Sequence, residues 1–323
     1  MNKRERVIAA IQGKEVDSIP SSFSLHFPTE IAFGNAAVEA HLDFYQKTDT
    51  DILKIMNENL VPYMGEINHA SDYRKVRFSI HDQFMVDQLD LIKKILERCD
   101  DECFTMGTLH GITASTIHPL EKMHEALDYN GVRSYLNRLF EENPIPVIDC
   151  MKHIADEMCE LVYASVKLGL DGIYYAALGG ERRFFTDEQF AECIEPLDKM
   201  VLNAVSEAGG YCFLHICKDG LNMERYKDYG NYFDVVNWGV YEVPFSLEKG
   251  RSMFPDKTIM GGLENRSGVL IEGSVDEVKE EVTNVIRTAG KKRFILGADC
   301  TLATDQDLKK VRAAVDAARV VKN

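Results

Sequence analysis

Short apolar segments alternate with longer stretches of helical periodicity along most of the chain. The apolar segments are rich in β-branched and aromatic residues, so the pattern predicts strands that alternate with helices. Eight strands in a chain of 323 residues favour a (β/α)8 TIM barrel. A doubly wound open sheet is the alternative, although the glycine fingerprint of a dinucleotide site is missing after the first strand. The predicted strands are Ile19–His26, Asp51–Met56, Thr105–His110, Gly172–Leu178, Tyr211–Cys217, Val235–Val240, Thr258–Leu263 and Phe294–Cys300.

Polar caps mark the start of two predicted helices. Thr186 precedes a segment with glutamine at position 189, which completes a capping box, and Ser274 precedes a segment whose valine and isoleucine side chains share one face. Residues 83–98 also carry helical periodicity, and residues 1–13 predict an amphipathic helix rather than a secretory signal. Helices therefore separate the predicted strands, as a TIM barrel requires.

The charge balance limits the classes of partner. The chain holds 37 Lys and Arg against 52 Asp and Glu, a formal net charge of −15, so we expect neither a nucleic acid nor an anionic membrane as a partner. No apolar stretch reaches the roughly 18 residues that a membrane span needs, which predicts a soluble, cytoplasmic protein. Without a Pro/Gly/Ser-rich linker, residues 1–323 are expected to form one domain.

Two cysteines and a histidine at strand ends point to a metal site. His215 and Cys217 lie two apart in a predicted strand, so their side chains share a face and can bind one ion. Cys300 ends the last predicted strand and reaches the same end of the barrel. One His and two Cys leave a fourth position for an exchangeable ligand, which is typical of catalytic zinc. Buried structural thiols are the alternative interpretation.

Other polar residues are placed to meet a substrate. His26 and His110 end the first and third strands, so they either contact the substrate at the barrel mouth or are structural histidines. Tyr174 and Tyr175 point to opposite faces of a strand, so one of them lines the cavity. Arg182, in the loop after the fourth strand, either pairs with a substrate carboxylate or sulfonate or is solvated.

The chain resembles the uroporphyrinogen decarboxylase-like superfamily, specifically its zinc-dependent methyltransferase branch with a His-x-Cys...Cys motif. This resemblance implies a TIM barrel that moves a methyl group between a corrinoid protein and a thiol such as coenzyme M. The segments that carry it, spread over nearly the whole chain, are Arg4–Pro20, Gly169–Tyr174, Phe213–Cys217, Met260–Leu263 and Phe294–Cys300.

The same resemblance implies the roles of individual residues. It assigns His215, Cys217 and Cys300 to zinc and to catalysis, with Glu242 as the candidate fourth ligand that a substrate displaces. A solvated loop carboxylate is the alternative role of Glu242. The chain lacks the Asp-x-His-x-x-Gly pattern of base-off cobalamin domains, so the cobalamin is expected on a separate corrinoid protein. The methyl donor, the acceptor and the direction of transfer stay open.

Two departures from the family pattern matter. After the His-x-Cys motif the chain continues Lys218-Asp219-Gly220, where many members have glycine sooner. Residues 21–28 contain no arginine, whereas the decarboxylase branch has an arginine-rich motif there, which makes porphyrinogen decarboxylation improbable. The alternatives to a methyltransferase are a decarboxylase of a carboxylated substrate and a non-catalytic module that binds a corrinoid protein or a thiol.

Overall fold

Eight parallel strands form the centre of the molecule in the computed structural model, which describes residues 1–321. The sheet order is β1-β8-β7-β6-β5-β4-β3-β2, and the Asp51 N–H closes the ring by donating to the Ser21 carbonyl at 3.1 Å. The predicted (β/α)8 barrel is therefore confirmed and the open sheet is wrong. Residues 322–323, the end of the predicted domain, lie outside the described residues. The strands are β1 (Ser21–Ser22), β2 (Ile52–Ile55), β3 (Phe104–His110), β4 (Gly172–Ala177), β5 (Tyr211–Ile216), β6 (Val235–Trp238), β7 (Thr258–Leu263) and β8 (Phe294–Ala298).

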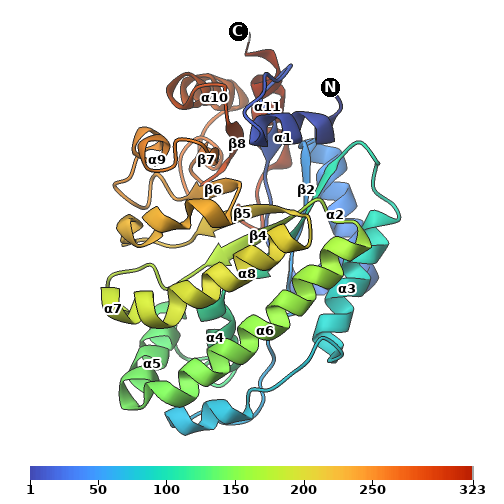
Figure 1. Ribbon diagram of the computed structural model, residues 1–323. Coiled ribbons are helices and arrows are strands. Elements are labelled where there is room, and N and C mark those ends of the chain that lie inside the picture. Colours follow the sequence, from blue (N-terminus) through green and yellow to red (C-terminus); the bar gives the residue numbers. More distant parts are fainter. Residues whose placement is uncertain (322–323) are drawn as a thin grey trace.

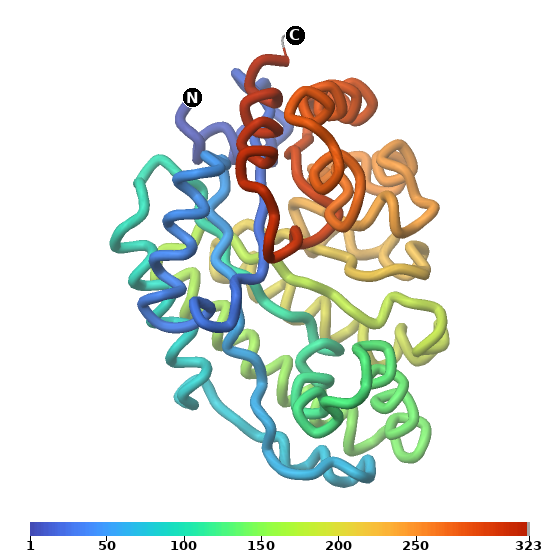
Figure 2. Tube along the Cα trace, turned by 180° about the vertical axis from the view of Figure 1, so that it is seen from behind, coloured from blue at the N-terminus to red at the C-terminus, as the bar shows by residue number. Residues whose placement is uncertain are grey.

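Helices form a layer around the strands, and both termini lie at the same end of the molecule (Figures 1 and 2). Within residues 1–321, no helix is both long and apolar enough to cross a membrane. The α-helices are α1 (Lys3–Ile11), α2 (Gly34–Thr48), α3 (Gln83–Leu96), α4 (Ile112–Glu121), α5 (Tyr129–Glu142), α6 (Pro144–Leu168), α7 (Asp187–Gln189), α8 (Glu195–Glu207), α9 (Leu247–Met253), α10 (Val275–Ala289) and α11 (Leu308–Val320). Short 3₁₀ segments cover Thr29–Ile31, Ala70–Lys75 and Met223–Tyr232, and a π-helical turn, Phe190–Ile194, joins α7 to α8.

The first strand is much shorter than predicted. Only Ser21 and Ser22 pair with β8, in register with Leu296 and Gly297, and the pairing stops one residue before β8 ends at Ala298. The chain meets its neighbour again at a single bridge between Leu25 and Leu302. The predicted caps are confirmed: Thr186 and Ser274 each form a capping box at the start of α7 and α10.

The barrel interior is apolar at one end and polar at the other. Phe104, Phe213 and Ile295 point inward and pack against side chains of α1, which closes the amino-terminal end of the barrel. The hydroxyl of Thr258 donates to the Ala10 carbonyl at 3.0 Å and fixes this helix to β7. The polar side chains of the interior lie at the carboxyl-terminal mouth of the barrel. TIM-barrel enzymes have their active sites at this end.

A buried carboxyl group of α8 lies against the outer face of β4. The Tyr175 hydroxyl donates to Asp198 of α8 and accepts from the Ile112 N–H at 3.1 Å, so Tyr175 faces the helices. Its neighbour Tyr174 consequently faces the barrel interior, which decides between the two tyrosines. Burial raises the pKa of Asp198 to about 7.

A buried ion pair joins α5 to the loop after β4. Arg133 and Glu181 form this pair with side chains 3% and 0% exposed. Glu181 also accepts from the Gly179 N–H at 3.0 Å, and the Arg133 guanidinium lies 4.1 Å from the Phe184 ring centroid. Both charges are therefore compensated inside the protein at the rim of the mouth.

The Arg133→Met variant should lose about 3 to 5 kcal/mol of unfolding free energy, because the Glu181 carboxylate would be left buried without its partner. Denaturant unfolding measures the change. The Arg138→Met variant on the same helix is the control, since the Arg138–Glu142 pair is exposed and such pairs contribute about 1 kcal/mol or less. Equal, small losses in both variants would contradict the role given to the buried pair.

The Asp198→Asn variant should change how stability depends on pH. The pKa of Asp198 is higher in the folded protein than its ordinary value of 3.8, so wild-type stability falls as pH rises from about 4 to about 7. Asparagine stays neutral at both pH values. The melting temperature of the variant minus that of wild type should therefore be larger at pH 8 than at pH 5, by an amount equivalent to a few kcal/mol of unfolding free energy. An identical difference at both pH values would contradict this assignment.

Candidate functional site

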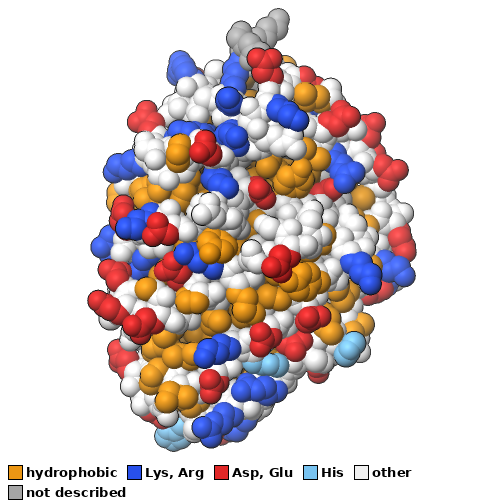
Figure 3. All heavy atoms as spheres, viewed as in Figure 1, with side chains coloured by type: hydrophobic (Ala, Val, Ile, Leu, Met, Phe, Trp, Pro, Cys, Tyr) orange, Lys and Arg blue, Asp and Glu red, His pale blue; other side chains and the backbone are white. Residues whose placement is uncertain are grey.

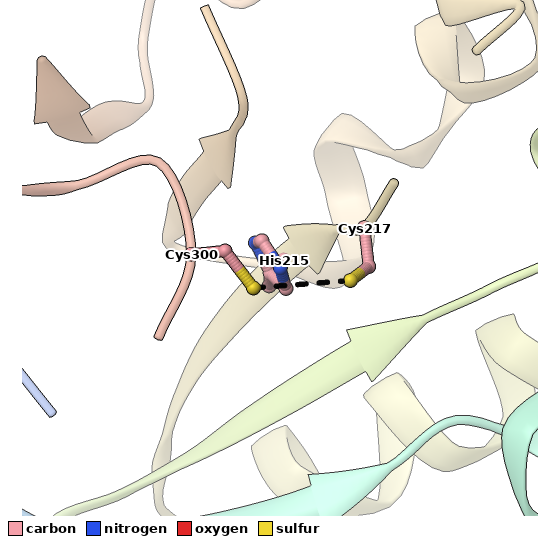
Figure 4. Close-up of side chains that lie close together, drawn as sticks. All are labelled: His215, Cys217 and Cys300. Carbon is pink, nitrogen blue, oxygen red and sulfur yellow. Dashed lines mark hydrogen bonds between the residues drawn. The ribbon is translucent and has the colours of Figure 1, made fainter. Parts of the chain in front are cut away.

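One histidine and two cysteines meet at the barrel mouth (Figure 4). His215 lies in β5 and Cys217 follows that strand, whereas Cys300 follows β8. Their donor atoms all lie within 4.8 Å of one another, and the two sulfur atoms are 4.0 Å apart. The structure thus brings together three residues that the sequence placed at the ends of two different strands.

The imidazole of His215 has no hydrogen-bond partner. The residue is 2% exposed, and both its ring nitrogens are buried without a partner among the described residues. Leaving a buried polar atom unpaired is costly, so the ring is arranged for a ligand that the polypeptide does not supply. The Tyr174 ring stacks on it with centroids 5.3 Å apart and an interplanar angle of 20°.

Asn237 of β6 anchors the stacked tyrosine. Its Oδ1 accepts from the Tyr174 hydroxyl at 2.8 Å, while its Nδ2 donates to the carbonyls of Met260 and Ala298 at 2.9 and 3.2 Å. Glycine at position 261 leaves room for this amide, because a Cβ there would lie 3.2 Å from Nδ2. A chain of contacts from four strands, β4, β6, β7 and β8, therefore orients the His215 ring.

The three donors fit a zinc ion. Tetrahedral zinc with Zn–S bonds of roughly 2.3 Å places two sulfur ligands about 3.8 Å apart, close to the 4.0 Å found between Cys217 and Cys300. Thiolate and imidazole are the donors that zinc accepts, and both nitrogens of His215 are free to bind. A hydrogen bond from Cys217, together with the nearby His215, lowers the pKa of Cys300, whereas the same hydrogen bond and burial raise the pKa of Cys217.

Glu242 lies beside this group but not within it. The residue is exposed in the loop after β6, and its carboxylate is not among the donors within 4.8 Å of one another. Partial burial and the neighbouring Cys300 raise its pKa, so the two side chains interact. Asp299 ties this loop to the end of β8, because its Oδ2 accepts from the Tyr241 N–H at 2.9 Å.

The two strand-end histidines lie on the β1–β3 side of the mouth. His26 Nδ1 lies 2.6 Å from Glu58 Oε1, and its side chain is 43% exposed. His110 Nε2 lies 3.0 Å from the Asn57 carbonyl, and burial lowers the pKa of His110 to about 4, so its ring is neutral at pH 7. Within residues 1–321, neither histidine belongs to the group of candidate metal donors.

Arg182 and Lys218 occupy the loops that border the site. Arg182 is exposed and donates to Asn222 Oδ1 at 3.1 Å, so its guanidinium already has a partner in the protein. Lys218 follows Cys217 with a φ of +82°, a left-handed conformation that costs a residue other than glycine about 1 kcal/mol or more. Its Nζ lies 4.4 Å from the Tyr129 ring centroid.

The sequence analysis missed one charged residue of the interior, Lys54 of β2. It is 8% exposed, and its Nζ lies 3.4 Å from the Tyr174 ring centroid. Taking an ammonium out of water costs several kcal/mol, whereas a desolvated cation–π contact returns only about 2 kcal/mol. Burial lowers the pKa of Lys54 to about 8, although Cys300 and Cys217 act in the opposite direction. The available signal was a lysine inside an otherwise apolar strand.

Solved structures share this fold over almost the whole chain. A methyltransferase from Methanosarcina mazei has a TM-score of 0.76 at 16% sequence identity, and the match covers 98% of this chain and 98% of that chain. A B12-independent methionine synthase from Shewanella sp. W3-18-1 has a TM-score of 0.62 at 9% identity, covering 94% of this chain and 97% of that chain. At such identities the similarity is one of fold.

Two comparisons of the sequence gave different results. In the first, no curated protein sequence matches the chain. The family model described as uroporphyrinogen decarboxylase (URO-D) matches residues 53–321, which include all three donors of the candidate metal site. The resemblance seen in the sequence is thereby confirmed at the level of the family, and the chain belongs to the uroporphyrinogen decarboxylase family.

Proposed function

We propose that this protein is a zinc-dependent methyltransferase that moves a methyl group between a corrinoid protein and a thiol or another small acceptor. His215, Cys217 and Cys300 would hold the zinc, and Glu242 would be the fourth ligand that a substrate displaces. The cobalamin would be carried by a separate protein that docks at the barrel mouth. The residues proposed to contact the substrate are His26, His110, Tyr174 and Arg182.

The observation that carries the proposal is the donor set. Two sulfurs 4.0 Å apart and an imidazole with two unpaired nitrogens suit a zinc site with an open position. Decarboxylation of a porphyrinogen needs no such set of donors. The fold shared with a methyltransferase and a methionine synthase adds support, because both of those names describe methyl transfer.

His215, Cys217 and Cys300 would hold the zinc, which would supply the Lewis acidity that deprotonates a bound thiol, whereas a free thiol has a pKa near 8.5. The acceptor sulfur would then take the methyl group from the corrinoid substrate. A bond from sulfur to carbon would form as the bond from cobalt to carbon breaks, its electron pair would stay with the corrinoid, and the thiol proton would leave to water. The same donor set serves the reverse transfer, from a methylated substrate to reduced cobalt.

The protein's own contribution is to keep the donors in place while the acceptor exchanges. The Tyr174 ring restrains the His215 imidazole, and Asn237 restrains Tyr174 through its hydroxyl. Such supporting contacts around metal ligands fix their orientation and tune their affinity. Burial of His215 and the surrounding side chains also limits the access of water to the reacting thiolate.

Protein purified without added metal should contain about one equivalent of zinc, and Cys217→Ser and Cys300→Ser should each reduce it below about a fifth of an equivalent. Loss of one thiolate leaves too few strong donors for zinc. Elemental analysis by mass spectrometry measures the content. The Glu242→Gln variant should keep its zinc, because three stronger donors remain. It should bind the zinc more weakly, because the fourth ligand has lost its charge.

Cys193→Ser is the matched control for metal content. Cys193 is partly exposed, as are Cys217 and Cys300, but it does not belong to the donor group. Its variant should retain the wild-type zinc content. A wild-type protein with less than about a tenth of an equivalent, whose activity survives chelation, would remove the zinc proposal.

With free methylcobalamin and a small thiol, the zinc-loaded protein should demethylate the corrinoid and yield a thioether. The Cys217→Ser variant should be slower by at least about 100-fold, because it no longer holds the group that activates the thiol. The corrinoid absorption spectrum and mass spectrometry of the thioether measure the reaction.

Two results would favour the other functions. Release of CO2 from a porphyrinogen, undiminished in Cys217→Ser and Cys300→Ser, would support a decarboxylase. Binding of a thiol or a corrinoid protein without methyl transfer, for every donor and acceptor pair tried, would support a non-catalytic module.

A further inference from the structure

We propose that Lys54 forms an anion-binding subsite inside the barrel mouth, where its ammonium pairs with a carboxylate or sulfonate group of the small acceptor. This inference rests on the proposed function, because the acceptor is the molecule that reaches the metal donors. It assigns to Lys54 the recognition of the charged end of that acceptor.

Lys54 points into the barrel rather than toward the helices. Its neighbours Leu53 and Ile55 pack in the large outer core, whereas Ile52 belongs to the interior cluster closed by α1. Side chains two apart in a strand share a face, so Lys54 follows Ile52 into the interior. Only 8% of the residue is exposed, so most of the side chain lies within the barrel.

The ammonium of Lys54 has no carboxylate partner among the described residues. Within residues 1–321 it forms neither an ion pair nor a hydrogen bond, and its contact is the face of the Tyr174 ring at 3.4 Å. An aromatic face attracts a cation but accepts no conventional hydrogen bond from its three N–H groups. Buried Lys residues are almost always paired, so the missing partner is expected from a ligand.

Two arginines around the mouth already have polar partners. Arg133 is paired with Glu181, and Arg182 donates to Asn222. On the face seen in Figure 3, Lys and Arg side chains are likewise interspersed with Asp and Glu. An unpaired buried cation is therefore the exception in a chain with a net charge of −15.

The position of Lys54 relative to the metal donors suits a small acceptor. One aromatic ring, that of Tyr174, contacts both the Lys54 ammonium and the His215 imidazole. The charges of Cys217 and Cys300 also act on Lys54. An acceptor whose sulfur reaches the three donors thus brings its other end close to the ammonium. A charge-assisted hydrogen bond in such a desolvated site is strong.

Thiols that differ in the charge of their far end test the subsite. With cobalt(II) in place of zinc, titration of the thiolate absorption gives equilibrium affinities without turnover. Wild type should bind 3-mercaptopropionate or 2-mercaptoethanesulfonate about 10- to 100-fold more tightly than 2-mercaptoethanol, the range expected for a hydrogen bond to a charged group. Cationic 2-mercaptoethylamine should bind most weakly. Preference for one of the two anions identifies the group that the subsite takes.

The Lys54→Met variant should reduce this preference for anionic thiols to less than about threefold. Lys218→Met is the matched control, because Lys218 is a second lysine beside an aromatic ring at the mouth but is partly exposed. That variant should keep most of the wild-type preference. Loss of the preference in Lys218→Met and its retention in Lys54→Met would overturn the assignment to Lys54.

Different results would contradict the anion-binding subsite and the methyltransferase function. Metal-loaded wild type that binds charged and neutral thiols alike overturns the subsite and leaves the methyltransferase proposal standing. Wild type that holds no metal or binds no thiol overturns the proposed function and the subsite with it.

Thermal unfolding separates a binding role from a structural one without any ligand. A lysine kept for binding contributes no stability, so Lys54→Met should have a melting temperature equal to or above that of wild type. Arg133→Met, which leaves Glu181 buried and unpaired, should melt lower. A similar drop in Lys54→Met would mean that Lys54 supports the fold, and would contradict the subsite.

Discussion

The approach of two sulfur atoms to 4.0 Å, across 83 residues of sequence, is the contact on which the candidate site depends. It exists because β5 and β8 are parallel members of one closed barrel, so both strands end at the same rim. The apolar layers beneath, closed by α1, keep that rim in place. His215 lies in β5, Cys217 follows the end of β5, and Cys300 follows the end of β8.

The polar side chains above those apolar layers are connected by a series of contacts. Asn237 takes its position from the carbonyls of β7 and β8, and it holds the Tyr174 hydroxyl. The Tyr174 ring in turn contacts His215 on β5 and Lys54 on β2. A candidate metal donor and a lysine are thus related through a single aromatic side chain, so a shift of the Tyr174 ring would move both contacts.

The barrel mouth contains two kinds of buried cation. Arg133 has its carboxylate in Glu181, and the pair joins α5 to the loop after β4. Lys54 has an aromatic face and no carboxylate. The first arrangement is complete within the protein, whereas the second lacks a negative charge. Because removing a charge from water is expensive, an unmatched cation at a binding site indicates the charge of what binds there.

The alternation of apolar segments with helical periodicity was sufficient to determine the eight strands and the barrel, because these signals are local. The spacing of His215 and Cys217 likewise determined that they share a face. The tertiary structure alone decided that Tyr174 rather than Tyr175 faces inward, that β1 is limited to two paired residues, and that Lys54 and His215 contact the same tyrosine ring. In a barrel both faces of a strand are buried, so no contrast between polar and apolar positions marks the inner face, and only closure of the sheet defines it.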